Sequence, residues 1–229
     1  MTTCSIKFFL VTICLGGFNI LFAQNDITVY LQPELSLSYK VKEGYSHFHS
    51  LQIRNYGYRD NEVQLKTRQI DLVHFSNWKL NLNQSLALGI QYRFREVFEP
   101  ESENELRLVQ QYNVSAQKGI MRFGHRFRAE QRISPSLTRH RFRYRFAIDL
   151  PLNGEKLDVG EAYLVASTEA LHTSSKGRAP SIDQRLTSFI GWQISPEAKW
   201  QVGVEYRAED YFKDTETILF LLSSLVFSL

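Results

Sequence analysis

Two neighbouring segments of the chain alternate arginine with aromatic residues. They read RFGHRFRAEQRI over 122–133 and RHRFRYRF over 139–146, with SPSLT between them. A period of two puts the two residue types on opposite faces of a β-strand, whereas a helix would mix them around its circumference. Guanidinium groups gathered on one face bind carboxylates or other oxyanions through their forked N–H donors. The spacing therefore indicates strands with one cationic face and one apolar face.

The apolar face of such strands needs a covering layer, and the sequence predicts no helix that could supply one. The favoured arrangement is a closed barrel with a charged, water-facing interior and an apolar exterior in lipid. The residues expected to line the lumen are Arg107, Arg122, Arg126, Arg128, Glu130, Arg132, Arg139, Arg141, Arg143, Arg145, Glu105 and Glu169. The residues expected to face lipid are Phe123, Phe127, Phe142, Tyr144, Phe146, Leu225 and Phe227.

Carboxylates on neighbouring strands are the expected partners of these arginines, because like charges placed directly opposite are unfavourable. A satisfied ladder would brace the interior, whereas a surplus of arginine would attract anions. If the turns centre near Lys118 and Lys156 and over 134–137, the facing pairs are Arg132 with Glu105, Glu130 with Arg107, Arg143 with Glu169, and Glu130 with Arg141.

The histidines are the residues on which an enzymatic function would depend, because interfacial lipid hydrolases use a serine nucleophile with a histidine as general base. His125 and His140 share the parity of the outward aromatics and would face Phe146 and Gln131, with no serine placed to receive either. His47 and His49 share a strand face and have serines near them in sequence only. We interpret these histidines as rim residues and predict no catalytic residues.

Metal and cofactor chemistry finds little support in the sequence. His47 and His49 have a spacing that can chelate, but no third ligand is correctly spaced. Cys4 and Cys14 both lie in the leader described below, which excludes disulfides and thiolate sites from the mature chain. We interpret the acidic segment over 98–104 as a solvated loop, in preference to a site that binds a divalent cation or cross-bridges lipopolysaccharide. We expect no cofactor and no metal.

Amphipathic strands are predicted along nearly the whole chain. Eleven segments are counted, over 27–39, 46–58, 62–76, 85–95, 105–114, 120–133, 138–152, 160–172, 182–194, 199–211 and 216–229, with a polar loop over 173–181. Because bacterial single-chain barrels have even numbers of strands, we expect ten or twelve, with twelve favoured. Pro33 predicts a bulge or an unpaired position in the first strand. Interfacial anchors are expected at Trp78, Trp192, Trp200, Tyr92, Tyr206 and Tyr211.

The N-terminus resembles a secretory signal peptide. Lys7 precedes an uncharged apolar run over 8–22, and Ala23 marks the expected cleavage position, so residues 1–23 are assigned to the signal and 24–229 to the barrel. No later stretch of about 18 apolar residues occurs, which excludes helical spanning of a membrane. Removal of Lys7 with the signal lowers the formal net charge from +3 to +2, which is too slight to indicate a nucleic-acid partner.

The succession of strand motifs resembles a known bacterial family. LALGIQYRFRE (86–96), ENELRLVQQ (103–111), RFRAEQRI (126–133), RFRYRF (141–146) and EYR (205–207) look like the domain of unknown function 2490, over essentially the whole mature chain. The resemblance implies a predicted outer-membrane β-barrel and brings no established activity.

These observations predict an all-β, up-and-down antiparallel transmembrane barrel with a narrow charged lumen, located in the outer membrane of a Gram-negative cell. The favoured role is non-enzymatic, either a narrow porin-like pore that favours anions or a closed structural barrel. The alternatives are an interfacial lipid-modifying enzyme of phospholipase or lipid A deacylase type, and a soluble periplasmic lipocalin-like binder whose arginine face would point outward. The expected partners are outer-membrane lipid, lipopolysaccharide and, through the strand over 216–229, the barrel-assembly machinery.

Overall fold

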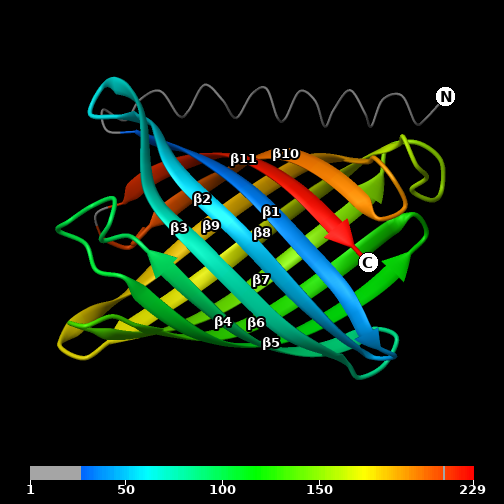
Figure 1. The fold of residues 1–229 in the computed structure, drawn as a ribbon, viewed down its shortest axis with the longest axis horizontal. Helices are drawn as coiled ribbons and strands as arrows, with labels where there is room; N and C mark the ends of the chain where they lie inside the picture. Colours follow the sequence, from blue (N-terminus) through cyan, green and yellow to red (C-terminus); the bar gives the residue numbers. More distant parts are fainter. Residues whose placement is uncertain (1–26, 214) are drawn as a thin grey trace.

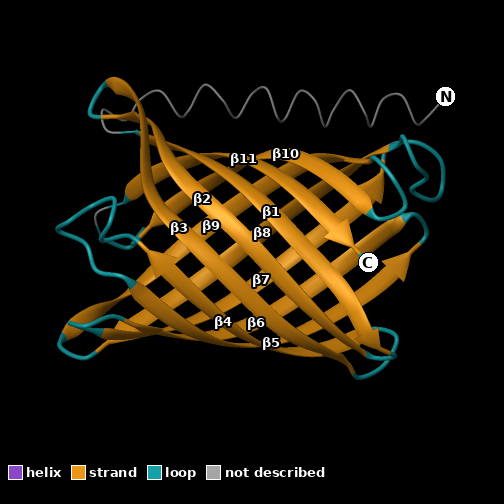
Figure 2. Ribbon diagram, viewed as in Figure 1, coloured by secondary structure: helices purple, strands orange, loops and turns teal. Residues whose placement is uncertain are grey.

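The computed structural model describes residues 27–213 and 215–229, which form a closed all-β barrel (Figures 1 and 2). The predicted signal peptide, with Cys4 and Cys14, lies outside these residues. The described strands are β1 (Thr28–Lys42), β2 (Tyr45–Arg59), β3 (Glu62–Lys79), β4 (Gln84–Phe94), β5 (Glu105–Lys118), β6 (Met121–Ile133), β7 (Thr138–Pro151), β8 (Ala162–Ser175), β9 (Arg178–Gln193), β10 (Ala198–Glu209) and β11 (Glu216–Ser228). Within the described ranges there is no helix long and apolar enough to cross a membrane.

Consecutive strands pair antiparallel around the barrel, and β1 closes it by pairing parallel with β11. The expectation of ten or twelve strands is therefore wrong for the described chain, which has the eleven counted from the pattern. An up-and-down chain alternates direction at every strand, so with an odd number the first and last strands run the same way. Parallel closure follows from the count, and the structure shows the two strands side by side (Figure 1).

Each end of the barrel collects its own set of turns. The end that carries Leu229 is here named the C-terminal rim, and it holds the connections over 43–44, 80–83, 119–120, 152–161 and 194–197. The opposite end is named the N-terminal rim. It holds the connections over 60–61, 95–104, 134–137, 176–177 and 210–215, of which residue 214 is not described. The polar loop expected over 173–181 is wrong, because β8 and β9 continue to a tight turn whose Gly177 has a φ of +73°. A positive φ is accessible to glycine without steric cost, which allows so short a connection.

The alternation of side chains separates an apolar outer face from a polar interior. The outer face exposes large apolar residues on most strands of the wall, among them Leu35, Leu88, Ile90, Phe127, Phe142, Leu186 and Leu221. Inward positions on the same strands are polar and largely buried, including Glu105, Arg107, Glu130, Arg132 and Glu169. An apolar exterior around a charged interior inverts the usual soluble arrangement.

Aromatic residues of the outer face gather at both rims. Trp78, Trp192 and Trp200 lie at strand ends of the C-terminal rim, where Trp192 and Trp200 stack with ring centroids 5.3 Å apart. Tyr92, Tyr206 and Tyr211 lie toward the N-terminal rim.

Pro33 sits in β1 without disturbing the seam. The β1–β2 ladder has no paired position at Gln32 or Pro33 and continues in the same register beyond them, while the register of Pro33 with Ser223 of β11 is continuous. The unpaired position predicted for this proline is thus found, and the β1 register shifts lie elsewhere, at Val29/Tyr30 and Lys40/Lys42.

Candidate functional site

The barrel interior contains two cavities that meet at one level. A central cavity of about 660 Å³ has fourteen arginines in its lining, more than any other residue type, and a vestibule of about 1180 Å³ opens toward the C-terminal rim. Phe48, Phe75, Arg126 and Arg128 line both cavities, so they form the junction between them. Phe75 lies flat against β4 because Gly89 has no side chain, and a Cβ there would come within 2.3 Å of its ring. The Arg128 guanidinium lies 5.2 Å from the Phe75 ring centre.

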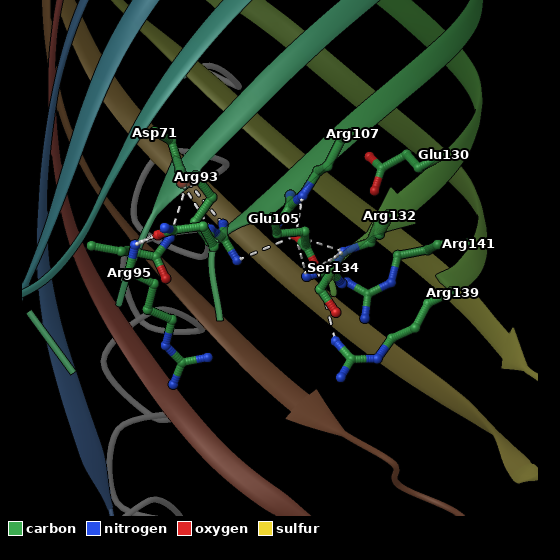
Figure 3. Close-up of polar contacts among 12 residues, drawn as sticks. Asp71, Arg93, Arg95, Glu105, Arg107, Glu130, Arg132, Ser134, Arg139 and Arg141 are labelled. Atoms are coloured by element: carbon green, nitrogen blue, oxygen red, sulfur yellow. Dashed lines mark hydrogen bonds and ion pairs between the residues drawn. The ribbon is translucent and has the colours of Figure 1, made fainter. Parts of the chain in front are cut away.

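One carboxylate, Glu105 at the start of β5, holds four arginines together (Figure 3). Its oxygens lie 2.6 Å from Arg107 Nε and 3.0 Å from Arg132 Nη2. Longer contacts join it to Arg93 at 3.9 Å and Arg139 at 3.8 Å. Asp71 is the second partner of Arg93, through a two-pronged pair of 2.7 and 2.8 Å. Glu105 is therefore the main counter-charge of the arginines toward the N-terminal rim.

Two further carboxylates serve the arginines of β6 and β7. Glu130 accepts a hydrogen bond of 2.7 Å from Arg143, whose other terminal nitrogen donates to Glu169 at 2.5 Å. Glu169 also accepts from Arg126 at 3.0 Å. Arg145 lies opposite both Arg126 and Glu169 in the sheet register, yet it makes no ion pair with any described residue. Its buried Nε, like that of Arg126 and Arg143, has no hydrogen-bond partner among them.

Positive charge exceeds negative charge in the interior. Six carboxylates share the lining of the central cavity with fourteen arginines, and four more, Glu99, Glu105, Glu130 and Asp183, pair with arginines of that lining. The vestibule adds Lys40, Lys42 and Lys79 against a single carboxylate, Glu43. Among the described residues, the interior thus carries a cationic surplus along its length. Such a surplus raises the local concentration of anions.

The N-terminal rim is narrowed by an aromatic cluster and a loop. Tyr30, Tyr56, Ile218 and Phe220 pack together inside the barrel beside the β1–β11 seam. The loop over 95–104 reaches this cluster through Glu99, which accepts hydrogen bonds from the Tyr56 hydroxyl and, at 2.8 Å, from Arg95. Burial raises the pKa of Glu99, but these hydrogen bonds and the charges of Arg95 and Arg68 outweigh it, so the pKa lies below its usual value.

The structure places the residues expected in the lumen as follows. Arg107, Arg126, Arg128, Arg132, Arg139, Arg141, Arg143, Arg145 and Glu169 line the central cavity, and Glu105 and Glu130 lie buried beside it. Arg122 sits at the C-terminal rim, where its side chain is 68% exposed and pairs with Asp149. The residues expected to face lipid all have outward parity, and Phe127, Phe142 and Tyr144 are the most exposed of them.

The expected facing pairs are partly wrong. Glu130 faces Arg141 as predicted, and His125 and His140 face Phe146 and Gln131. The turn after β5 lies one to two residues later than assumed, so Arg132 faces Arg107, and Glu130 faces Val109. Likewise Glu169 faces Arg145, and Arg143 faces Leu171. The pairs Arg132–Glu105 and Arg143–Glu169 still form, because long side chains reach diagonally to the next position on the neighbouring strand.

On the outer face, histidines of β2 and β3 lie close together, which was not predicted from the sequence alone. His49 of β2 faces His74 of β3, and His47 faces Ser76. Ser76 Oγ lies 3.3 Å from both His47 Nδ1 and His74 Nε2. His125 instead contacts the Tyr144 hydroxyl at 2.9 Å. No group of three or more His, Cys, Asp or Glu residues in the described chain is arranged to hold a metal ion.

The fold and the interior define a class, a closed all-β barrel with an arginine-rich interior and an apolar exterior. Residues 33–217 match the family model described as Protein of unknown function (DUF2490), and the chain belongs to this family. The resemblance noted from the strand motifs is thereby confirmed. Neither a curated protein nor a solved structure matches the chain.

Proposed function

We propose that the protein is an outer-membrane barrel whose interior passes small anions. The observation that carries this proposal is the junction between the two cavities. There Arg126 and Arg128 of β6 face Arg145 and Arg143 of β7, which line the central cavity next to the junction, and only Glu130 and Glu169 balance the four. An anion at this level would meet Arg145, which lines the central cavity and makes no ion pair with any described residue.

Membrane placement is supported by the outer wall. The shortest strand, β4, has 11 residues and would extend about 37 Å, or about 28 Å along the axis at a typical tilt of about 40°. That length exceeds the apolar band of about 25 Å that outer-membrane barrels present. Exposed apolar side chains fill the wall, and tryptophan and tyrosine residues occupy its rims as interfacial anchors do. Lipid and lipopolysaccharide are the partners this surface fits, with β11 as the segment read by the assembly machinery.

The lipocalin-like alternative required the arginine face to point outward. That requirement is not met, because these arginines line the interior cavity and the exterior is apolar. A protein with this exterior would expose its apolar wall to water, which favours aggregation.

Single-channel recording tests the proposal. The mature chain, refolded until unboiled gel mobility shows a closed barrel, is placed in a planar bilayer, and the reversal potential is measured in a salt gradient. We expect discrete steps that favour anions. Arg128→Glu and Arg145→Glu should reduce or reverse that preference, whereas Arg122→Gln at the exposed rim should leave it nearly unchanged.

A widened junction distinguishes a pore from a closed barrel. Phe75→Ala removes a ring that lines both cavities and should raise the conductance of each step. If the wild type and Phe75→Ala both stay silent in well-folded form, the interior is closed and the arginine ladder serves only to brace the barrel.

A further inference from the structure

The strongest unassigned feature of the molecule is the polar group on the outer face near the C-terminal rim. It consists of His47, His49, His74 and Ser76, together with Tyr45, and is here named the histidine–serine cluster. Polar groups on a mainly apolar wall are costly in lipid unless they are paired or functional, and the other outward polar side chains include pairs such as Gln110 with Gln131. The His49 and His74 ring centres are 4.6 Å apart, and those of His47 and His74 are 5.1 Å apart.

We infer that this cluster is a serine hydrolase site that cleaves acyl esters of membrane lipids, with Ser76 as nucleophile and His47 as general base. A serine within hydrogen-bond reach of an imidazole is the minimal arrangement for nucleophilic acyl transfer. The inference goes beyond anion passage and shares with the proposed function only the placement in a membrane.

The hydrogen-bond pattern at Ser76 assigns the two imidazoles different roles. The Tyr45 hydroxyl donates to Ser76 Oγ at 3.3 Å, and the serine has one proton of its own to donate. His74 Nδ1 is buried and has no partner among the described residues. A buried N–H without an acceptor is rarer than a bare acceptor nitrogen, so His74 carries its proton on Nε2 and donates it to Ser76. The Ser76 proton then points to His47 Nδ1, which is the acceptor and the base.

The surroundings of the cluster fit a lipid ester. Ser76 faces Leu88 of β4, and Leu88, Leu86 and Trp78 line an outer groove of about 740 Å³ whose walls are almost wholly apolar. That volume lies within the range of small-ligand sites and suits an acyl chain lying along the wall. Trp78 stacks on Tyr45 with centroids 5.4 Å apart, which marks the headgroup level.

The reaction balances with water as the only co-reactant. Ser76 Oγ attacks the ester carbonyl carbon as His47 Nδ1 takes the hydroxyl proton, and the Tyr45 hydroxyl can donate to the oxyanion that forms. The bond to the alcohol breaks, and His47 returns the proton to the departing oxygen. Water then attacks the acyl-serine with His47 again as base, releasing a fatty acid and restoring Ser76.

The test is fatty-acid release by the refolded full chain in mixed micelles. One arm offers phosphatidylethanolamine and a second offers lipopolysaccharide, which distinguishes the two lipid sources. We expect release in at least one arm, with Ser76→Ala and His47→Ala each lowering the rate at least 100-fold and His74→Ala lowering it less. Ser188→Ala, on the outer face of β9 opposite Val204, and His125→Ala are matched controls that should keep the wild-type rate.

A second readout does not depend on turnover. A serine-directed fluorophosphonate should label the wild type at Ser76, located by peptide mass, and should not label His47→Ala at a comparable rate. Absence of both release and labelling in a protein with closed-barrel gel mobility would overturn the inference, as would release that survives Ser76→Ala. Hydrolysis of water-soluble p-nitrophenyl butyrate separates this site from membrane placement and conductance. Arg145→Glu, which changes the interior and lies outside the groove, should leave this hydrolysis unchanged.

Discussion

Replacing Glu105 by glutamine removes the carboxylate that forms ion pairs with both Arg107 and Arg132. Both arginine side chains are only 9% exposed, and neither contacts another carboxylate within 4.0 Å among the described residues. Breaking a buried ion pair from one side costs about 3–5 kcal/mol, since an uncompensated charge stays buried. Both arginines line the central cavity, whose water can solvate them in part, so we expect the lower end, about 3 kcal/mol.

Urea unfolding of the protein refolded in vesicles, followed by tryptophan fluorescence, measures this change. Glu103→Gln is the matched control, because Glu103 lies two residues away in an exposed loop, where it accepts hydrogen bonds from Ser136. The triple variant Glu105→Gln, Arg107→Gln, Arg132→Gln removes the unpaired charges and should recover much of the lost stability. If Glu105→Gln unfolds at the wild-type urea concentration, or if the triple variant is less stable than the single one, Glu105 is not the counter-charge that holds this part of the interior.

Two further predictions concern the N-terminal rim and the seam. The pKa of Glu99 is lowered in the folded state, so the stability that Glu99 gives the docked loop should be complete above the ordinary glutamate range and lost as pH falls through its lowered pKa. Proteolysis of the loop over 95–104 should therefore become faster at that low pH. A proteolysis rate that does not change with pH would contradict this. Leu35 and Leu225 are register partners on the outer face, so the double variant Leu35→Cys, Leu225→Cys should form a disulfide on oxidation of the mature chain. The control Leu35→Cys, Leu221→Cys should not. The reverse result would exclude the parallel seam.

The strands could be predicted closely from the sequence because their turns are marked by glycine, proline and asparagine, and because apolar parity is clear in β4, β6 and β7. The alternation pattern indicates the eleven strands that the structure has. The expectation of ten or twelve is wrong because it rests on the even strand numbers of other bacterial barrels and not on a feature of this sequence. Blurred alternation in β2 and β3 has a physical cause. Their pairing shifts register at Arg54/Asn55 and Tyr56/Tyr58, which changes which parity faces inward along the strand.

Register was the part that parity could not predict. A shift of two residues leaves every side chain on the same face, so the pattern of arginine and aromatic residues is equally satisfied before and after it. The turn at Gly119, with a φ of +60°, sets the β5–β6 register, and the sequence offered a neighbouring lysine as an equally acceptable centre. The histidine–serine cluster was missed for the same reason, because His74 and Ser76 meet His47 only when the β2–β3 register is known.

The seam shows why the interior is not uniformly arginine. Parallel pairing is slightly less stable per residue than antiparallel pairing, and β1 meets β11 over eleven such positions. At this place the inward side chains become aromatic, and the Tyr30 ring packs 5.1 Å from Phe220. Arg207, which pairs with Glu205, lies 3.8 Å above the Phe220 ring. Arg54, which makes no ion pair with a described residue, lies 4.8 Å from the same ring and rests on an aromatic face instead. Burying Phe220 completely at the seam therefore both strengthens the weakest pairing of the wall and accommodates the arginine surplus next to it.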